Sequence, residues 1–238
     1  GFMEAGLKGM DVTNNSYYVD PFEFWCGDQP EQAPALEAVR RAVDWSTEQG
    51  TVHAAAAGNS AYDLSNKTTN ASSPNDGTSV ERTINSSCKD IPTELDGVVT
   101  VSSIDRQGKL SSFSNRGLGS IDVAAPGSSI LSTIVRDNGW GLKSGTSMAS
   151  PHAAGVASLI VSRYGKTAGK AGFGLAADTT REVLLGTARN KACPEPRAVV
   201  YPGLPAAYTA TCVGDEDFNG FYGEGIIDAR AAVAKKKL

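Results

Sequence analysis

The stretch from Gly145 to Gly155, GTSMASPHAAG, constrains this chain more than any other part of the sequence. Gly145 permits a tight turn because glycine has no Cβ, and Thr146 can cap a helix by accepting a bond from a free N–H. The residues that follow are mostly small and apolar, which predicts a buried helix over about 146–163. The stretch therefore predicts a sharp turn that delivers Ser147 into the first turn of a buried helix.

Ser147 is expected where helix N–H groups lack partners and the helix dipole favours negative charge. Pro151 has no N–H and stands four residues further on, so the carbonyl of Ser147 has no donor within the helix. A helix with a purely structural role does not need this cost. We interpret Ser147 as a candidate nucleophile. The alternative is a buried helix with no catalytic role, whose serines serve only as caps.

Length and charge exclude several classes of protein. A chain of 238 residues can bury one large α/β core. The formal net charge of −4 is mild and gives no reason to expect a nucleic-acid partner. Because no apolar run approaches the length of a membrane span, no membrane partner is expected either.

The four cysteines, Cys26, Cys88, Cys193 and Cys212, form no C-x-x-C pair, which disfavours zinc binding and thiol redox chemistry. Two disulfides are expected, for which three pairings exist. We favour Cys193–Cys212, which closes a short Pro-rich loop and leaves Cys26–Cys88. Disulfides predict an oxidising compartment and hence a secreted, extracellular protein. Four reduced cysteines in loops are the alternative.

The pattern of apolar residues predicts alternating strands and helices. A continuous apolar strand between a helix and Gly58-Asn59 is typical of a parallel sheet. Strands are predicted over 7–19, 51–59, 97–105, 121–127 and 129–135, helices over 31–49, 146–163 and 176–189, and long loops over 60–97 and 190–213.

The stretch GTSMASPHAAG resembles the nucleophile motif of the subtilisin-like serine proteases, the subtilases. The segments 113–117 (FSNRG) and 121–127 (IDVAAPG) resemble two further landmarks of that family in the same order, and 222–233 resembles its closing helix. The resemblance implies a three-layer α/β fold, with a mostly parallel sheet and helices on both faces. It also implies a serine endopeptidase in which Ser147 attacks the peptide carbonyl and forms an acyl-enzyme.

The resemblance also suggests the remaining site residues. The segment 56–59 (AAGN) resembles the family's oxyanion segment, so the amide of Asn59 is expected to donate to the oxyanion; a turn residue is the alternative. The expected substrate-binding residues are Asn14, Ser16, Tyr17, Ala57 and Gly58. Tyr18 and Val19 replace two glycines usual in the family, which predicts a bulky wall beside the specificity pocket.

A serine nucleophile needs a base, and the base needs an orienting group. His152 lies five residues after Ser147, about 140° around the helix, and the resemblance implies a buried, structural role for it. His53 lies in an apolar strand and matches no histidine motif of the family. The family's aspartate and histidine motifs do not occur in the sequence.

The resemblance therefore implies that residues 1–238 form the C-terminal portion of a single catalytic domain, whose N-terminal part is missing. Histidine and aspartate are expected from an N-terminal protease chain or segment, and the chain alone is expected to be inactive and poorly stable because a sheet edge is exposed. The alternative is a catalytically inactive subtilase-fold binding module. An esterase is disfavoured because GTSMA lacks the second glycine of G-x-S-x-G.

No cofactor is expected. The run Asp215-Glu216-Asp217 leaves calcium open, but a solvated acidic turn is favoured because adjacent carboxylates alone are weak evidence of a metal site. We therefore assign no metal ligand.

Overall fold

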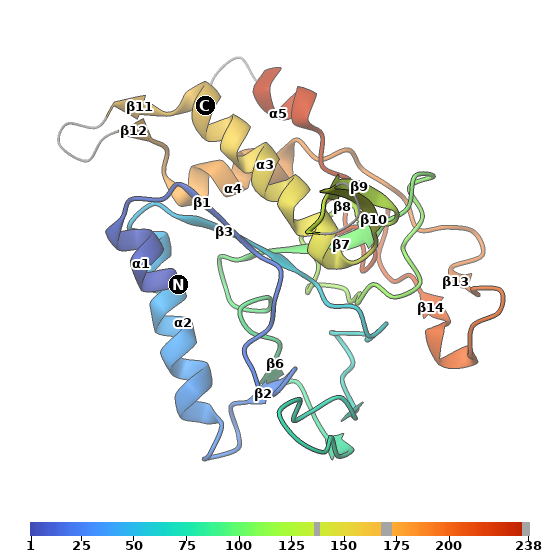
Figure 1. Ribbon diagram of the computed structural model, residues 1–238. Coiled ribbons are helices and arrows are strands. Elements are labelled where there is room, and N and C mark those ends of the chain that lie inside the picture. Colours follow the sequence, from blue (N-terminus) through green and yellow to red (C-terminus); the bar gives the residue numbers. More distant parts are fainter. Residues whose placement is uncertain (136–138, 168–172, 235–238) are drawn as a thin grey trace.

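A four-stranded parallel sheet, in the order β1-β3-β7-β8, organises the fold in this computed structural model, which describes residues 1–135, 139–167 and 173–234 (Figure 1). Its strands are β1 (Val12–Asn15), β3 (Val52–Ala56), β7 (Val99–Ile104) and β8 (Val123–Pro126). All three pairings are parallel. Every residue of β3 and β7 is buried, as expected for inner strands covered on both faces.

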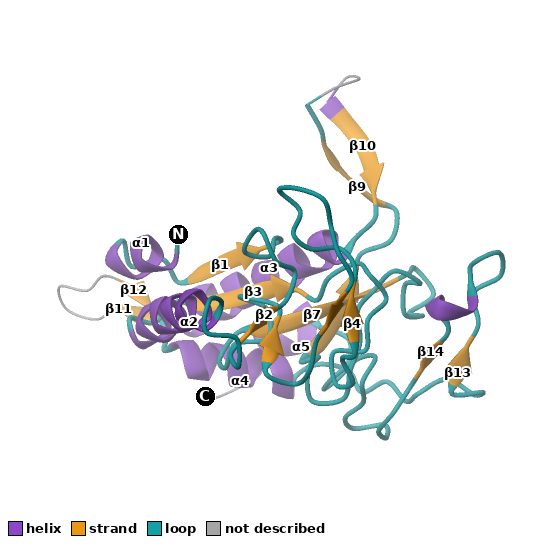
Figure 2. Cartoon of the chain, turned by 90° about the horizontal axis from the view of Figure 1, so that it is seen from below, coloured by secondary structure: helices purple, strands orange, loops and turns teal. Residues whose placement is uncertain are grey.

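Helices flank both faces of this sheet. On one face, Val52 and Ala54 of β3 pack in a core with α3 (Thr146–Tyr164), α4 (Ala177–Gly186) and α5 (Ala229–Ala234). On the other face, Ala55 packs with α2 (Ala33–Glu48), against which α1 (Phe2–Leu7) lies. Figures 1 and 2 show α2 and α3 on opposite sides of the strands. The predicted α/β fold with a parallel sheet flanked by helices is confirmed.

The helix predicted over 31–49 is α2, and it is amphipathic. Val43 and Ser46 are buried. The exposed side carries Arg40, which pairs with Glu37 and Asp44. The alternation of apolar and charged residues therefore determined both this helix and the face it buries.

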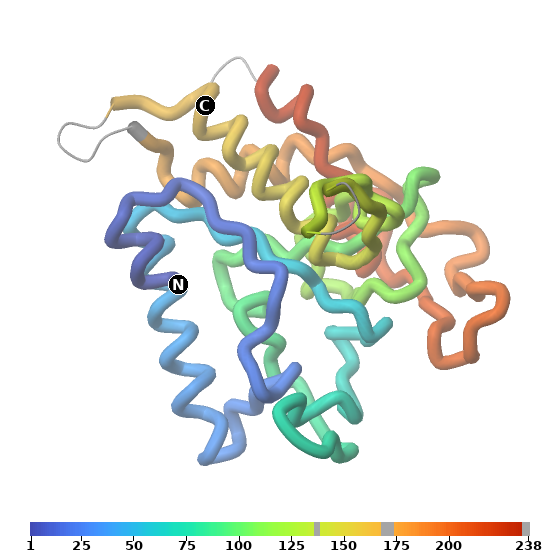
Figure 3. Tube along the Cα trace, in the orientation of Figure 1, coloured from blue at the N-terminus to red at the C-terminus, as the bar shows by residue number. Residues whose placement is uncertain are grey.

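The remaining elements are mostly short ladders on the surface. The β9–β10 hairpin projects from the body in Figure 2, and the segment that holds β13 and β14 extends from one end of the trace in Figure 3. The sequence predicted neither α1 nor β10. The shorter elements are β2 (Trp25–Cys26), β4 (Thr69–Asn70), β5 (Arg82–Thr83), β6 (Cys88–Lys89), β9 (Ile130–Thr133), β10 (Trp140–Lys143), β11 (Lys166–Thr167), β12 (Phe173–Gly174), β13 (Ala198–Val199), η3 (Ala206–Tyr208) and β14 (Ala210–Thr211).

Two disulfides link segments outside the four-stranded sheet. Cys26–Cys88 joins β2 to β6, which pair as antiparallel strands. Cys193–Cys212 joins the Pro-rich loop to the residue after β14. The pairing favoured from the sequence is confirmed. In the described ranges no helix is both long and apolar enough to cross a bilayer.

His53 lies inside the sheet on β3. Its side chain is fully buried, and its Nδ1 is 2.7 Å from the hydroxyl of Thr13 on the paired strand β1. The ring of Phe2 packs edge-on against it, with ring centroids 5.2 Å apart. Burial lowers the pKa of His53 to about 4, so the ring is neutral at pH 7.

The depressed pKa of His53 predicts acid sensitivity. In the unfolded chain the imidazole gains a proton near pH 6.5, whereas in the folded chain it does so near pH 4. The burial of the neutral ring therefore stabilises the fold in full above pH 6.5. As the pH falls to 4, this contribution to the free energy of unfolding decreases by about 3 kcal/mol. Denaturant melts from pH 7 to pH 4 should show this loss in the wild type but not in His53→Gln.

His152→Gln, at an exposed histidine, is the control. Its free energy of unfolding should depend on pH as that of the wild type does. Carboxyl groups that titrate in the same range are common to all three proteins, so the difference isolates His53. An equal slope in His53→Gln and wild type would contradict the assignment.

Candidate functional site

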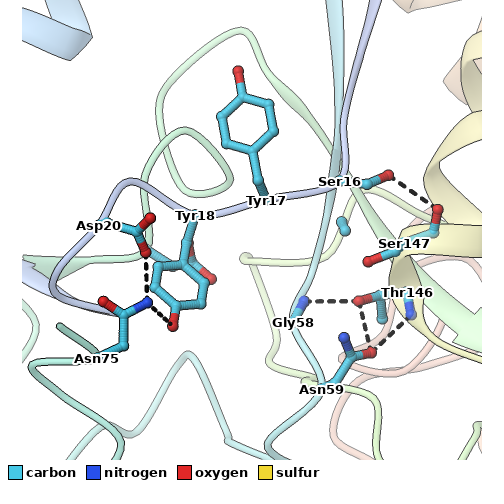
Figure 4. Close-up of a pocket in the computed structure, with 11 residues that line it drawn as sticks. Ser16, Tyr17, Tyr18, Asp20, Gly58, Asn59, Asn75, Thr146 and Ser147 are labelled. Carbon is cyan, nitrogen blue, oxygen red and sulfur yellow. Dashed lines mark hydrogen bonds between the residues drawn. The ribbon is translucent and has the colours of Figure 1, made fainter.

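The carboxyl ends of β1 and β3 meet the N-terminus of α3 beside a pocket of about 290 Å³ (Figure 4). In a parallel sheet, side chains just past the strand ends lie at one edge, where ligands commonly bind. The residues that line this pocket are Ser16, Tyr17, Tyr18, Asp20, Ala56, Gly58, Asn59, Asn75, Asp90, Thr146 and Ser147. Segments far apart in the sequence thus converge on Ser147.

Asn59 is fixed in orientation by Thr146. The Asn59 Oδ1 accepts hydrogen bonds from the N–H of Thr146 at 2.8 Å and from its hydroxyl at 3.0 Å. The same hydroxyl accepts from the N–H of Gly58 at 3.1 Å. Because the oxygen end of the amide is bound to α3, the NH₂ end is left for the pocket, as Figure 4 shows.

The expectation that Thr146 caps its own helix is wrong. Thr146 is already the first residue of α3, Gly145 holds the N-cap position, and no side chain of the cap residue bonds the helix. Asn59 supplies the acceptor instead, from a different segment of the chain. The side chain of Asn59, which the sequence analysis assigned to the oxyanion site, therefore also joins the end of β3 to the start of α3.

Ser147 is half-buried, and its hydroxyl points into the pocket in Figure 4. The neighbouring N–H groups are used, since Thr146 donates to Asn59 and Met148 donates to the carbonyl of Gly145. The N–H of Ser147 has no acceptor in the described part of the chain. A Cβ built on Gly145 would lie 3.6 Å from both Asn59 Oδ1 and Ser147 N, which shows how closely the two segments approach.

The carbonyl of Ser147, which Pro151 leaves without a helical donor, is bound from outside the helix. Ser16 Oγ, just past the end of β1, donates to it at 3.0 Å. Next to this bond, Ser150 Oγ donates to Asn14 Oδ1 at 2.7 Å. Two side-chain hydrogen bonds thus attach the end of β1 to the first turn of α3.

The predicted substrate-binding residues divide into two groups. Ser16, Tyr17 and Gly58 line the pocket. The side chain of Asn14 is turned to Ser150, and Ala57 is fully buried and lies outside the pocket lining.

A second wall of the pocket comes from residues that follow β1 and from the long polar loop. Asn75 Nδ2 donates to the hydroxyl of Tyr18 at 3.1 Å and to Asp20 Oδ1 at 2.6 Å. Burial raises the pKa of Tyr17 and of Tyr18, so both phenols stay neutral. No sequence motif indicates Asp20, Asn75 or Asp90, because their place in the site depends on how the loops fold.

Gly58 occupies a position that only glycine fits. Its φ is +99°, and a Cβ there would come 2.3 Å from Asn115 Nδ2. Asn115 in turn accepts hydrogen bonds from the N–H groups of Ser60 and Tyr62. Asn115 is therefore part of the hydrogen-bond network that holds the turn carrying Asn59.

Neither of the two histidines, both within the described residues, lines the pocket. His53 is buried in the sheet. His152 is exposed, and its Nδ1 donates to the carbonyl of Met148 at 2.8 Å. The expectation that His152 is buried is wrong, because it lies on a face of α3 that no described element covers.

The described residues contain one grouping of metal-ligand type, formed by Cys26, Asp28 and Cys88. Its two sulfurs share a disulfide, so neither is a thiolate that can bind a metal. In the acidic run, Asp215 Oδ1 accepts the N–H groups of Asp217 and Phe218, as in an ordinary turn.

The bond from Ser16 to Ser147 predicts a stability effect. Ser16→Ala leaves the half-buried carbonyl of Ser147 without its partner, which should lower the free energy of unfolding by about 1 kcal/mol. The matched control is Ser158→Ala, because Ser158 donates to the Ala154 carbonyl inside α3 and that carbonyl keeps its helical donor. Equal losses in the two variants, measured by urea melts, would contradict this role of Ser16.

Comparison with known proteins agrees with this geometry. The sequence pattern of the subtilase family, Peptidase_S8, matches residues 3–225. Subtilisin DY from Bacillus licheniformis is 31% identical over 232 residues, which cover 98% of this chain and 60% of that protein. The extracellular basic protease of Dichelobacter nodosus is 37% identical over 130 residues, which cover 52% of this chain and 17% of that protein.

Among solved structures, the epidermin leader peptide processing serine protease of Staphylococcus aureus superimposes with a TM-score of 0.67. Its sequence is 22% identical, and the match covers all of this chain and 54% of that protein, so the likeness shows the fold alone. The chain thus spans little more than half the length of subtilisin DY and of the epidermin leader peptide processing protease. Since the family pattern extends over nearly the whole sequence, this protein belongs to the subtilase family.

Proposed function

We propose that this chain carries the nucleophile and the oxyanion site of a serine endopeptidase. The observation that carries the proposal is one pocket into which the Ser147 hydroxyl and the Asn59 amide both point, at the N-terminus of α3 (Figure 4). A hydroxyl beside fixed N–H donors suits acyl transfer, because negative charge develops on the carbonyl oxygen in the transition state.

In the proposed reaction, Ser147 Oγ attacks the carbonyl carbon of a peptide bond and gives its proton to a base. The resulting oxyanion accepts hydrogen bonds from the NH₂ of Asn59 and from the free N–H of Ser147. The C–N bond then breaks as the base returns the proton to the leaving amine, which leaves an acyl-enzyme. Water, deprotonated by the same base, releases the acid and restores the hydroxyl.

We further propose that the base and its aspartate come from polypeptide outside this sequence. His53 is neutral, buried and bonded to Thr13, and His152 is bonded to the carbonyl of Met148 away from the pocket. Relatives of the chain are considerably longer. On this proposal residues 1–238 are the C-terminal portion of one catalytic domain.

Two uncovered surfaces support the proposal of an additional segment. In the described chain β1 pairs with β3 on one side and has no neighbour on the other. The uncovered face of α3 exposes Leu159 (49% exposed) together with His152 and Gly155. An open strand edge and an exposed leucine on a core helix are costly unless another segment covers them.

Peptide or protein substrates are the proposed ligands. The end of β1, from Asn14 to Tyr17, is proposed to pair with the substrate backbone as an added strand, beside Gly58 on the opposite wall. An extracellular location is proposed because the chain has two disulfides and because the Dichelobacter nodosus relative is named as extracellular.

A fluorophosphonate probe tests the proposal and its alternative. Ser147 should be labelled in the chain combined with its natural upstream polypeptide and not in the chain alone, because the hydroxyl needs a proton acceptor. Added imidazole should partly replace that acceptor in the chain alone. Mass spectrometry locates the label, and Ser147→Ala is the control.

The outcomes separate the hypotheses. Labelling of the chain alone, without imidazole, would show that the base lies within these 238 residues. No labelling under any condition would favour a catalytically inactive binding module.

Asn59→Leu tests the oxyanion donor. The variant removes the NH₂ group at nearly constant volume, so kcat of the complemented enzyme should fall about 10²- to 10³-fold, the range known for loss of such a donor in subtilisin itself. KM should change little, because the donor acts mainly in the transition state. Thr146→Ser, which keeps the hydroxyl that orients Asn59, is the control and should remain close to wild type; an unchanged kcat in Asn59→Leu would contradict the assignment.

A further inference from the structure

The pocket beside Ser147 contains a buried carboxylate that lacks a partner. Asp90 lines the pocket and is only 2% exposed. Its Oδ1 accepts no hydrogen bond from any described residue. A charged carboxylate that is removed from water without a partner is strongly unfavourable, so this group calls for a cation or a donor.

The other carboxylates buried near Asp90 are satisfied. Glu23 accepts hydrogen bonds from the side chains of Ser60, Asn70 and Ser72. Glu94 pairs with Lys67 Nζ at 2.6 Å and also accepts the N–H of Asp90 at 2.8 Å. Among these three carboxylates, only Asp90 has an oxygen that is buried and accepts no hydrogen bond from a described residue.

The surrounding charges do not compensate Asp90. The groups that act on it are Glu94 and Glu23, which repel its charge, and Lys67, which attracts it. Lys67 is already bound to Glu94 and to the carbonyl of Leu64. Burial, with a smaller effect of the two glutamates, raises the pKa of Asp90 well above its usual range.

The carboxylate lies next to the oxyanion segment. A Cβ built on Gly58 would be 3.6 Å from Asp90 Oδ2, and Gly58 directly precedes Asn59. The charge of Asp90 also acts on Tyr18, which lines the same pocket. With Ala56 and Gly58 as small walls, a long side chain can enter beside Ser147 and bring its end to Asp90.

We propose that this pocket takes the side chain of the residue whose carbonyl Ser147 attacks, and that Asp90 selects arginine or lysine there. The inference rests on the proposed peptidase function. The guanidinium or ammonium group would donate to the unpartnered carboxylate and supply the positive charge that the site lacks. Asp90 is thus a specificity-determining residue rather than part of the reacting group.

Binding of p-aminobenzamidine tests the pocket without any catalytic base. The wild-type chain should bind this fluorescent cation, and Asp90→Asn should weaken binding at least about tenfold, as expected for loss of a charge-assisted hydrogen bond. Asp96→Asn removes an equal charge from an exposed position outside this pocket and should bind as wild type. No binding by wild type, or equal binding by Asp90→Asn, would overturn the inference.

Cleavage by the complemented enzyme tests substrate choice. Two peptides that differ only by arginine or its neutral isostere citrulline before the scissile bond should differ about 10- to 100-fold in kcat/KM, and Asp90→Asn should largely abolish that ratio. Equal cleavage of both peptides would overturn the specificity and leave the peptidase proposal standing. Failure to cleave either peptide, with Asp90-dependent p-aminobenzamidine binding, would overturn the peptidase proposal alone.

Misfolding does not confound these variants. The carboxyl group of Asp90 accepts no hydrogen bond from a described residue that asparagine would lose, and the substitution removes an acid whose ionisation is disfavoured by burial and by the two glutamates. The melting temperature of Asp90→Asn should therefore equal or exceed that of the wild type. Circular dichroism melts of both variants check this before binding is compared.

Discussion

The hydrogen bonds between Asn59 and Thr146 are the interaction on which the candidate site depends. They join the turn after the inner strand β3 to the first turn of the core helix α3, two segments 87 residues apart. Further hydrogen bonds fix both partners. The hydroxyl of Thr146 accepts the N–H of Gly58, and the side chain of Asn115 accepts N–H groups of the turn that follows Asn59. The amide that faces the pocket is therefore oriented by bonds to its oxygen and not by the pocket itself.

The helix that carries Ser147 packs firmly against the sheet through apolar contacts. Ala149, Ala153 and Ala157 are fully buried against the sheet, and small side chains let the helix approach the strands closely. Pro151 removes one helical donor, and Ser16 replaces it from the end of β1. The site thus combines a rigid packed layer with a few polar bonds at its edge, which is the arrangement that precise positioning of a reactive group requires.

The same structure explains why the chain has an open side. Among the described residues, helices cover both faces of the sheet but no strand pairs with the outer edge of β1. The same residues cover α3 toward the sheet but not where His152 and Leu159 lie. The pocket has a hydroxyl, two N–H donors and a buried carboxylate at its wall, yet neither histidine reaches it. These features together define the uncovered side of the molecule and its relation to the candidate site.

Much of the fold could be predicted from local sequence. The helix periodicity of α2, the mostly apolar run of β3, the β-branched residues of β7 and the run of small residues in α3 are each local features of the sequence, and the structure has all four elements. The disulfide Cys193–Cys212 was predicted because it closes a short Pro-rich loop, and Cys26–Cys88 was the pair that remained. By contrast, α1 and β10 were missed, because short surface elements depend on what they pack against more than on their own pattern.

The sequence by itself determined the family, the sheet and helices, and the segments that carry Ser147 and Asn59, because these depend on local patterns and motifs. Only the tertiary structure decided that Thr146 binds Asn59 instead of capping its own helix, that His152 is exposed, and that Ala57 and the side chain of Asn14 lie outside the pocket. It also decided that Asp90, which belongs to no motif, is buried in the lining of the same pocket as Ser147, with an Oδ1 that accepts no hydrogen bond from a described residue. Such facts depend on contacts between segments distant in the chain, and no local pattern encodes them.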